Sequence, residues 1–133
     1  EKSISKKSRW FYYLIAEHNG KVYVRKRGPK DIWENLYEFM LEETSQAIAT
    51  DKITSLPSFK KLIGKNKFEI IAVSKDFRQQ LTHQTIHSQF LLLSAAKKPA
   101  IADYMAVPSK QLDNYAFPKT ITDFLENKSL GLF

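Results

Sequence analysis

The dipeptide Asn19-Gly20 is the feature that most constrains how this chain can fold. It stands between two runs rich in aromatic and β-branched residues, 10–17 and 21–27. Asn-Gly is a preferred centre of a two-residue type I′ turn, because both residues tolerate a positive φ. The two runs are therefore predicted to be the antiparallel strands of a β-hairpin, and the core is expected to be built on a β-sheet.

The second strand of this hairpin is predicted to have one apolar face and one basic face. Successive side chains of a strand point to opposite sides, so Val22 and Val24 share a face. The opposite face would carry Lys21, Tyr23, Arg25 and Arg27. The candidates for contacts to DNA phosphates, which set register without reading sequence, are Lys21, Arg25, Arg27 and Lys30. A solvated edge strand that resists aggregation is the alternative.

Positive charge is concentrated at the start of the chain. The 133 residues contain 21 Lys and Arg against 14 Asp and Glu, a formal net charge of +7. The first 30 residues hold nine of the basic residues and only Glu1 and Glu17 as acids, which accounts for the whole excess. A localised positive field attracts polyanions, so nucleic acid is an expected partner, and a merely solubilising segment is the alternative.

Beyond the hairpin, the pattern indicates strands separated by short helices. Strands are expected at 36–41, 68–73, 77–81, 85–93 and 104–107, and short helices within 44–63, after Ser109 and from Pro118. This arrangement indicates an α+β domain with a mixed or antiparallel sheet. The basic segment 1–9 is predicted to be a linker from a longer polypeptide, which leaves residues 10–133 as one domain.

The residue inventory excludes several kinds of site. The chain has no cysteine, so disulfides, thiolate zinc sites and cysteine-ligated clusters are excluded within it. No apolar run approaches the roughly 20 residues that a membrane-spanning helix requires. His83 and His87 have the spacing HxxxH, but their surroundings favour a strand, on which they would stand roughly 13 Å apart. No metal site is therefore predicted.

Glu38, Glu42 and Glu43 are the acidic residues best placed for magnesium. Nudix pyrophosphohydrolases hold this ion with several glutamates on one helix face, after a glycine-rich turn, and segment 33–39 (WENLYEF) resembles the approach to that motif. The following residues do not match, because no glycine pair and no glutamate cluster come next. Nucleotide hydrolysis is not expected, and the three glutamates are interpreted as charges at a sheet edge and a helix start.

Segment 80–83, Gln-Leu-Thr-His, resembles the Phe-Ser-His-type motif of the C-terminal domain of MutY-type adenine DNA glycosylases. Four further features agree with this family: the hairpin ending in Arg-Lys-Arg at 25–27, the block at 33–39, the density of strands around the motif, and Tyr-Ala-Phe-Pro at 115–118. The resemblance extends over nearly all of residues 10–125. It implies a Nudix-like α+β domain with short helices flanking the sheet.

The resemblance implies that Thr82, at the position of the motif's serine, reads 8-oxoguanine, with Leu81 and His83 beside it. Oxidation at C8 places a hydrogen on N7 and adds an oxygen, so it changes the donors and acceptors that guanine presents. A hydroxyl group can both donate and accept, and could register that change. Leu81 replaces an aromatic residue, which removes stacking, and Thr82 is bulkier than serine. His83 would orient the turn or contact phosphate; satisfying local backbone groups is the alternative.

The same resemblance implies that this domain has no catalytic residue and no cofactor of its own. Adenine would be extruded and removed by a separate N-terminal catalytic domain that carries an iron–sulfur cluster. The expected partners are double-stranded DNA with 8-oxoguanine opposite adenine and that N-terminal domain. The chain is expected to be a monomer in the bacterial cytoplasm, at the nucleoid. Two alternatives stay open: a divergent Nudix pyrophosphohydrolase, and a module whose basic hairpin binds an acidic protein.

Overall fold

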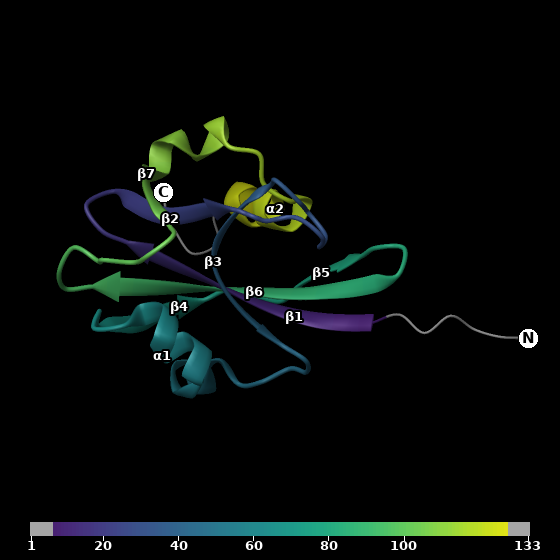
Figure 1. Cartoon of the computed structure of the whole chain (residues 1–133), viewed down its shortest axis with the longest axis horizontal. Coiled ribbons are helices and arrows are strands. Elements are labelled where there is room, and N and C mark those ends of the chain that lie inside the picture. The colour runs from purple at the N-terminus through teal and green to yellow at the C-terminus, as the bar shows by residue number, and fades with distance from the viewer. Residues whose placement is uncertain (1–6, 128–133) are drawn as a thin grey trace, which may run out of the picture.

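A mixed β-sheet forms the centre of the computed structural model, which describes residues 7–127 (Figure 1). The strands are β1 (Lys7–Glu17), β2 (Lys21–Lys26), β3 (Tyr37–Thr44), β4 (Phe68–Val73), β5 (Phe77–Gln80), β6 (Gln84–Ala95) and β7 (Met105–Pro108). Two 3-10 helices, η1 (Thr50–Ser55) and η2 (Ser109–Asn114), and two α-helices, α1 (Pro57–Ile63) and α2 (Lys119–Asn127), complete the described part. The strand order is β4-β6-β1-β3-β2-β7, and β5 also pairs with β6.

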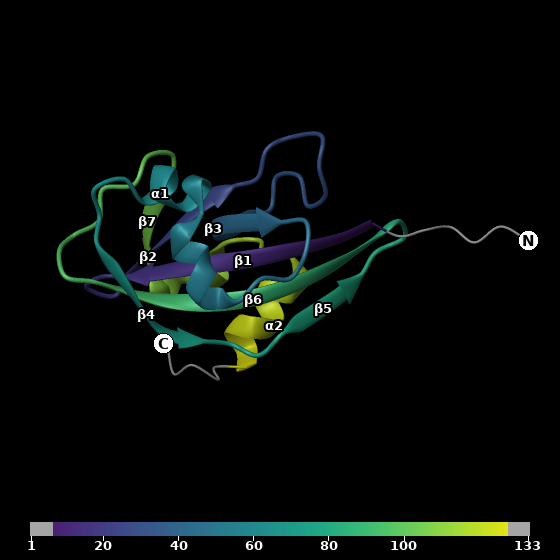
Figure 2. The same cartoon turned by 90° about the horizontal axis from the view of Figure 1, so that it is seen from below.

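The long central strands β1 and β6 run parallel and are paired along almost their whole length, from Lys7 opposite Gln84 to Glu17 opposite Ser94. The other strand pairs of the described residues are antiparallel. β4 and β5 follow one another along the same side of β6 (Figure 2). The predicted α+β class, with a mixed sheet and short flanking helices, is confirmed.

The predicted hairpin is confirmed at its turn and wrong beyond it. Asn19 and Gly20 have φ values of 52° and 75°, as the turn type requires, and His18 and Lys21 form a two-way backbone pair at 2.9 and 3.0 Å. After this bridge the two strands separate, and β3 lies between them in the sheet. One end of β3 pairs with β2 and the other with β1, so it fills the opening between the two strands.

Both faces of the sheet carry a hydrophobic core. On one face, Phe11, Tyr13 and Ile15 of β1 pack in a cluster with residues of η2 and α2. On the other face, the alternate side chains of β1 join a cluster with Ile53 of η1 and Phe59 of α1. The continuous apolar run of β1 follows from this double burial, because a strand covered on both faces has no polar side. Figure 1 shows α2 and η2 on one side of the sheet and α1 on the other.

Several predicted boundaries need correction. Lys7, Ser8 and Arg9 belong to β1, so the last three residues of the predicted linker 1–9 are part of the sheet, and residues 1–6 lie outside the described residues. β3 extends to Thr44 and β6 to Ala95, beyond the predicted ends. The predicted limits of α1 are confirmed, with Pro57 at its start and Gly64, at φ 61°, after its end.

None of the helices within residues 7–127 has the length and apolar character that crossing a membrane requires.

Candidate nucleic-acid interface

Thr82 and His83 form the exposed tip of the turn between β5 and β6. The strand pairing ends at Gln80 opposite Thr85, and the Leu81 amide donates a hydrogen bond to the Gln84 carbonyl at 2.8 Å. Leu81 is half-buried and packs against the core face that α2 covers. Leu81 therefore anchors the turn, and Thr82 is exposed to solvent. We refer to residues 81–84 as the Thr82 turn.

The Thr82 turn is tied to the first residues of the central strand β1. The Lys7 amide donates to the His83 carbonyl at 3.3 Å. The side-chain oxygen of Gln84 accepts a hydrogen bond from Nη1 of Arg9 at 3.1 Å. Because both contacts come from a strand of the sheet centre, the position of the turn is set by the core of the domain and not by the β5–β6 hairpin alone.

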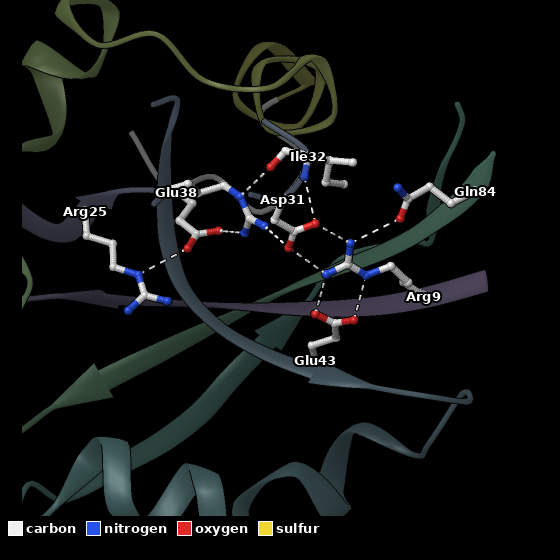
Figure 3. A network of polar contacts seen from close by, with 8 residues as sticks. Arg9, Arg25, Asp31, Ile32, Glu38, Glu43 and Gln84 are labelled. Carbon is white, nitrogen blue, oxygen red and sulfur yellow. Dashed lines mark hydrogen bonds and ion pairs between the residues drawn. The ribbon is translucent and has the colours of Figure 1, made fainter. Parts of the chain in front are cut away.

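Arg9, which is itself buried, is the centre of a partly exposed polar network beside this turn (Figure 3). Its Nε and Nη2 donate to the two carboxylate oxygens of Glu43 at 2.7 and 2.8 Å. Its Nη1 and Nη2 also donate to the two oxygens of Asp31 at 2.8 and 2.9 Å. Hydrogen bonding from Arg9 lowers the pKa of Asp31 to about 2. The loop that carries Asp31, between β2 and β3, is thereby fastened to the same end of the sheet as the Thr82 turn.

The predicted basic face of β2 is wrong. Arg27 lies just after the strand and is 9% exposed; its Nη1 donates to Glu38 at 2.7 Å and its Nη2 to Asp31 at 2.8 Å. Tyr23 is also buried. β2 lies between β3 and β7, and its side chains pack in both core clusters, so the strand has no continuous solvent face. The Arg27 guanidinium is therefore not available to a phosphate.

The other predicted phosphate contacts do not form one patch. Arg25 has 41% of its side chain exposed, but its Nε donates to Glu38 at 3.2 Å and its guanidinium lies 4.8 Å from the centre of the Tyr104 ring. Lys21 and Lys30 are exposed. Lys21 is at the far end of β1 from the Thr82 turn, since a strand of 11 residues spans about 33 Å. Lys30 precedes Asp31 and is therefore the predicted cation whose loop is anchored near the turn.

The three glutamates of the predicted edge and helix start lie on β3, in the interior of the sheet order, so that interpretation is wrong. Glu38 is 1% exposed and pairs with arginine side chains. Glu42 is also buried; it accepts a hydrogen bond from the Ser58 hydroxyl, and burial raises its pKa. Glu43 pairs with Arg9. Each carboxylate therefore has a structural partner within the fold.

Residues 7–127 contain no group of three or more His, Asp or Glu side chains positioned to hold a metal ion. His87 lies on β6 and stacks on Trp10, with ring centres 4.6 Å apart and planes 10° apart. Within η1 and α1, which follow β3, the charged residues are Asp51, Lys52, Lys60 and Lys61. These two helices therefore carry mainly basic residues, in contrast to the cluster of glutamates on one helix face that Nudix pyrophosphohydrolases use to hold magnesium.

Comparison with known proteins assigns the chain to a family, because the model of the NUDIX domain matches residues 11–127. The chain belongs to this family. This Nudix domain resembles the MutT protein of Methanosarcina mazei Go1, with 13% sequence identity and a TM-score of 0.69 over 94% of this chain and 95% of that one. A search of curated proteins finds no match.

Two other solved structures with a similar fold come from proteins with different names and contexts. The C-terminal domain of mouse MUTYH, solved in complex with human PCNA, has 13% identity and a TM-score of 0.60 over 89% of this chain and 85% of that chain. The Ap4A hydrolase of C. elegans has 6% identity and a TM-score of 0.59 over 97% of this chain and 100% of that chain. At these identities the likeness shows the Nudix fold alone.

Proposed function

We propose that this Nudix domain is the lesion-reading domain of a MutY-type adenine DNA glycosylase. It would bind duplex DNA with 8-oxoguanine opposite adenine, and a separate N-terminal catalytic domain with an iron–sulfur cluster would remove the adenine. The observation that carries the proposal is the exposed Thr82-His83 tip, because the motif resembling that of MutY-type enzymes falls on it. The similarity to the C-terminal domain of mouse MUTYH supports the same assignment.

The chemistry of Thr82 suits discrimination between the two bases. In 8-oxoguanine, N7 carries a hydrogen that a hydroxyl oxygen can accept, whereas N7 of guanine is an acceptor. The exposed Thr82 hydroxyl can therefore accept from the lesion at N7 or donate to its new oxygen. One such hydrogen bond contributes about 0.5–1.5 kcal/mol, which corresponds to roughly two- to twelvefold in affinity.

The anchoring of the turn supports this use of Thr82. Leu81 packs on the core, and the backbone bond from Lys7 and the side-chain bond from Arg9 hold the residues on either side of the tip. A recognition group that is already positioned loses less conformational entropy on binding, so more of its hydrogen-bond energy appears as affinity. Lys30, on the loop that Asp31 fastens to Arg9, is a phosphate contact in this proposal.

A divergent Nudix pyrophosphohydrolase is the second candidate. The similarity to the MutT protein of M. mazei and to the Ap4A hydrolase of C. elegans favours it. The environment of the β3 glutamates argues against it, because Glu38 and Glu43 are paired with arginines and Glu42 is bonded to Ser58. Carboxylates engaged in this way are poor ligands for magnesium, which requires free oxygens in octahedral geometry.

The test is an NMR titration of the 133-residue chain with two matched duplexes, one with 8-oxoguanine and one with guanine opposite adenine. We expect larger shifts at Leu81, Thr82 and His83 with the lesion duplex, and a two- to twelvefold loss of lesion preference in Thr82→Ala. Thr122→Ala, on α2, is the matched control and should keep the preference. Equal shifts confined to lysines would refute lesion reading. Magnesium-dependent release of phosphate from a nucleotide panel would favour the hydrolase instead.

A further inference from the structure

Two loops far apart in the sequence form a second basic site, which we call the lysine pocket. It is a cavity of about 320 Å³ between the α1–β4 loop and the segment after β6, lined by Lys65, Lys67, Lys97 and Lys98 and by Phe68 and Ala95 at the strand ends. Among residues 7–127, no acidic side chain lines it. The ion pairs found within residues 7–127 involve none of its four lysines.

Asn66 holds the two loops of the lysine pocket together. Its Nδ2 donates to the Ile63 carbonyl at 2.7 Å and to the Ala100 carbonyl at 2.8 Å, and its Oδ1 accepts from the Ala100 amide at 2.9 Å. The amide group is thus fully engaged in bracing the loops. Four like charges are kept around one cavity to which the described part of the chain contributes no counter-charge, and such an arrangement favours an anion as partner.

The lysine pocket and the Thr82 turn lie at the two ends of β6. The Thr82 turn ends at Gln84, where β6 begins, and Lys97 and Lys98 come two and three residues after the end of β6 at Ala95. A strand of 12 residues spans about 36 Å between its ends. One turn of B-form DNA repeats every 34–36 Å or so. A duplex placed along β6 would therefore reach both sites, with about one helical turn of DNA between them.

The edge of the sheet between the two sites is formed by β4 and β5 (Figure 2). It exposes Lys75 and Arg78, which are balanced by the exposed Glu69 and Asp76. This edge therefore has no net positive charge, and the lysine pocket is a separate basic site. The charge pattern therefore favours contact with a polyanion at the lysine pocket over contact along this edge.

We propose that the lysine pocket binds the phosphate backbone of duplex DNA about one helical turn from the base that the Thr82 turn contacts. The inference rests on the proposed binding of DNA, but not on the reading of 8-oxoguanine. Lysine contacts to phosphate contribute affinity that depends on salt and not on base sequence. The lysine pocket thus holds the duplex in register while the turn contacts a base.

The first experiment measures DNA binding of the 133-residue chain by fluorescence anisotropy over a range of salt. The variant K65Q/K67Q/K97Q/K98Q is compared with K52Q/K60Q/K61Q/K110Q, which removes the same charge from exposed lysines of η1, α1 and η2. On a duplex of about 30 base pairs, the pocket variant should lower the slope of log affinity against log salt by up to about 3.6, since each lost phosphate contact contributes about 0.9. The control variant should lower it by less than half as much. Equal slopes for the two variants would overturn the proposal.

The second experiment varies the length of the DNA. A duplex of about 8 base pairs centred on the lesion is too short to reach the pocket, because each base pair rises only about 3.4 Å. The pocket variant and the original chain should bind this duplex equally. An equal loss on short and long duplexes would contradict the spacing of one turn. A titration with inorganic phosphate separates the two sources of the anion: shifts at Asn66 with phosphate, without any effect of the variant on DNA affinity, would also overturn it.

The two proposals fail in distinguishable ways. If the pocket variant weakens the lesion duplex and the guanine duplex alike while Thr82→Ala has no effect, the lysine pocket stands and lesion reading is refuted. If Thr82→Ala removes lesion preference and the pocket variant behaves like its control, lesion reading stands and the pocket inference is refuted. If the original chain binds no duplex at low salt, both are refuted.

Discussion

Arg9 binds Glu43 through two parallel hydrogen bonds, from Nε to Oε2 at 2.7 Å and from Nη2 to Oε1 at 2.8 Å. The pair joins the start of β1 to the end of β3, and Arg9 is only 8% exposed. A bidentate pair fixes the orientation of both groups. Since Arg9 also contacts Gln84, the same side chain links these strands to the first residue of β6.

Replacing Arg9 by alanine should destabilise the domain. Asp31 and Glu43 would lose their shared cation, and both carboxylates are more than a third exposed, so we expect about 2 kcal/mol and not the larger cost of a fully buried pair. Urea unfolding measures the effect. Lys119→Ala is the control, because its pair with Asp123 is exposed and its loss should leave the midpoint unchanged. An unchanged midpoint for Arg9→Ala would show that the network contributes no stability.

Asp31 should make the domain sensitive to acid. Its pKa is lowered to about 2 in the folded state, against about 3.9 for an unfolded aspartate. A lowered pKa means that the unfolded state binds protons first, so the stabilisation is complete above pH 4 or so and is lost as the pH falls toward 2. The difference in unfolding free energy between the original chain and Asp31→Asn should shrink over this range. A difference that stays constant with pH would contradict the assignment.

Glu42 should act in the opposite direction. Burial raises its pKa, so the folded state binds a proton more readily than the unfolded state, and the charged carboxylate costs stability as the pH rises. Glu42→Gln keeps an oxygen for the Ser58 hydroxyl and removes the buried charge. We expect this variant to be more stable than the original chain at neutral pH, with an advantage that decreases in acid. Thermal unfolding at several pH values tests this, and a loss of stability at neutral pH would refute it.

Two adjacent tyrosines of β1 should respond differently to loss of the hydroxyl group. The Tyr13 hydroxyl is buried and has no hydrogen-bond partner among the described residues, so Tyr13→Phe should be neutral or stabilising by up to about 1 kcal/mol. The Tyr12 hydroxyl donates to the Ile48 carbonyl and accepts from its amide, so Tyr12→Phe should cost about 1 kcal/mol. Denaturant unfolding measures both variants, and each serves as the control for the other because both lose the same hydroxyl group. Equal losses would mean that Tyr13 has a bonding partner.

The features that the sequence predicts correctly depend on neighbouring residues. Asn19 and Gly20 determine the turn through their own backbone preferences, and Pro57 and Gly64 likewise limit α1. The alternation of apolar side chains identifies strands but not their partners. The place of β3 between β1 and β2 was not predicted for this reason, because it depends on residues far away in the chain.

In the candidate site, too, the features set by neighbouring residues were predicted and those set by distant residues were not. The Thr82 turn is found from a local motif, but Arg9 stands in a polar segment that reads as a linker, and its partners Asp31, Glu43 and Gln84 are 22, 34 and 75 residues away. The basic pattern of β2 misled the prediction because the β-strand period says nothing of what covers each face. The lysine pocket could not be predicted from the sequence, because its two loops are joined by a contact between Asn66 and Ala100, which are 34 residues apart.

Because β6 is paired with β1 along nearly its whole length, insertions and deletions can change the distance between the two ends of β6 only in discrete steps. Unless a β-bulge absorbs it, adding or removing one residue within the pair would turn every following side chain to the opposite face, so two residues is the smallest change that keeps the pattern of the strand. Two residues lengthen a strand by about 6.6 Å, close to the roughly 6.8 Å that two base pairs occupy. The length of β6 therefore sets the separation of the Thr82 turn and the lysine pocket in steps of about two base pairs. Relatives of this domain that bind DNA at both sites should differ in the length of β6 by even numbers of residues.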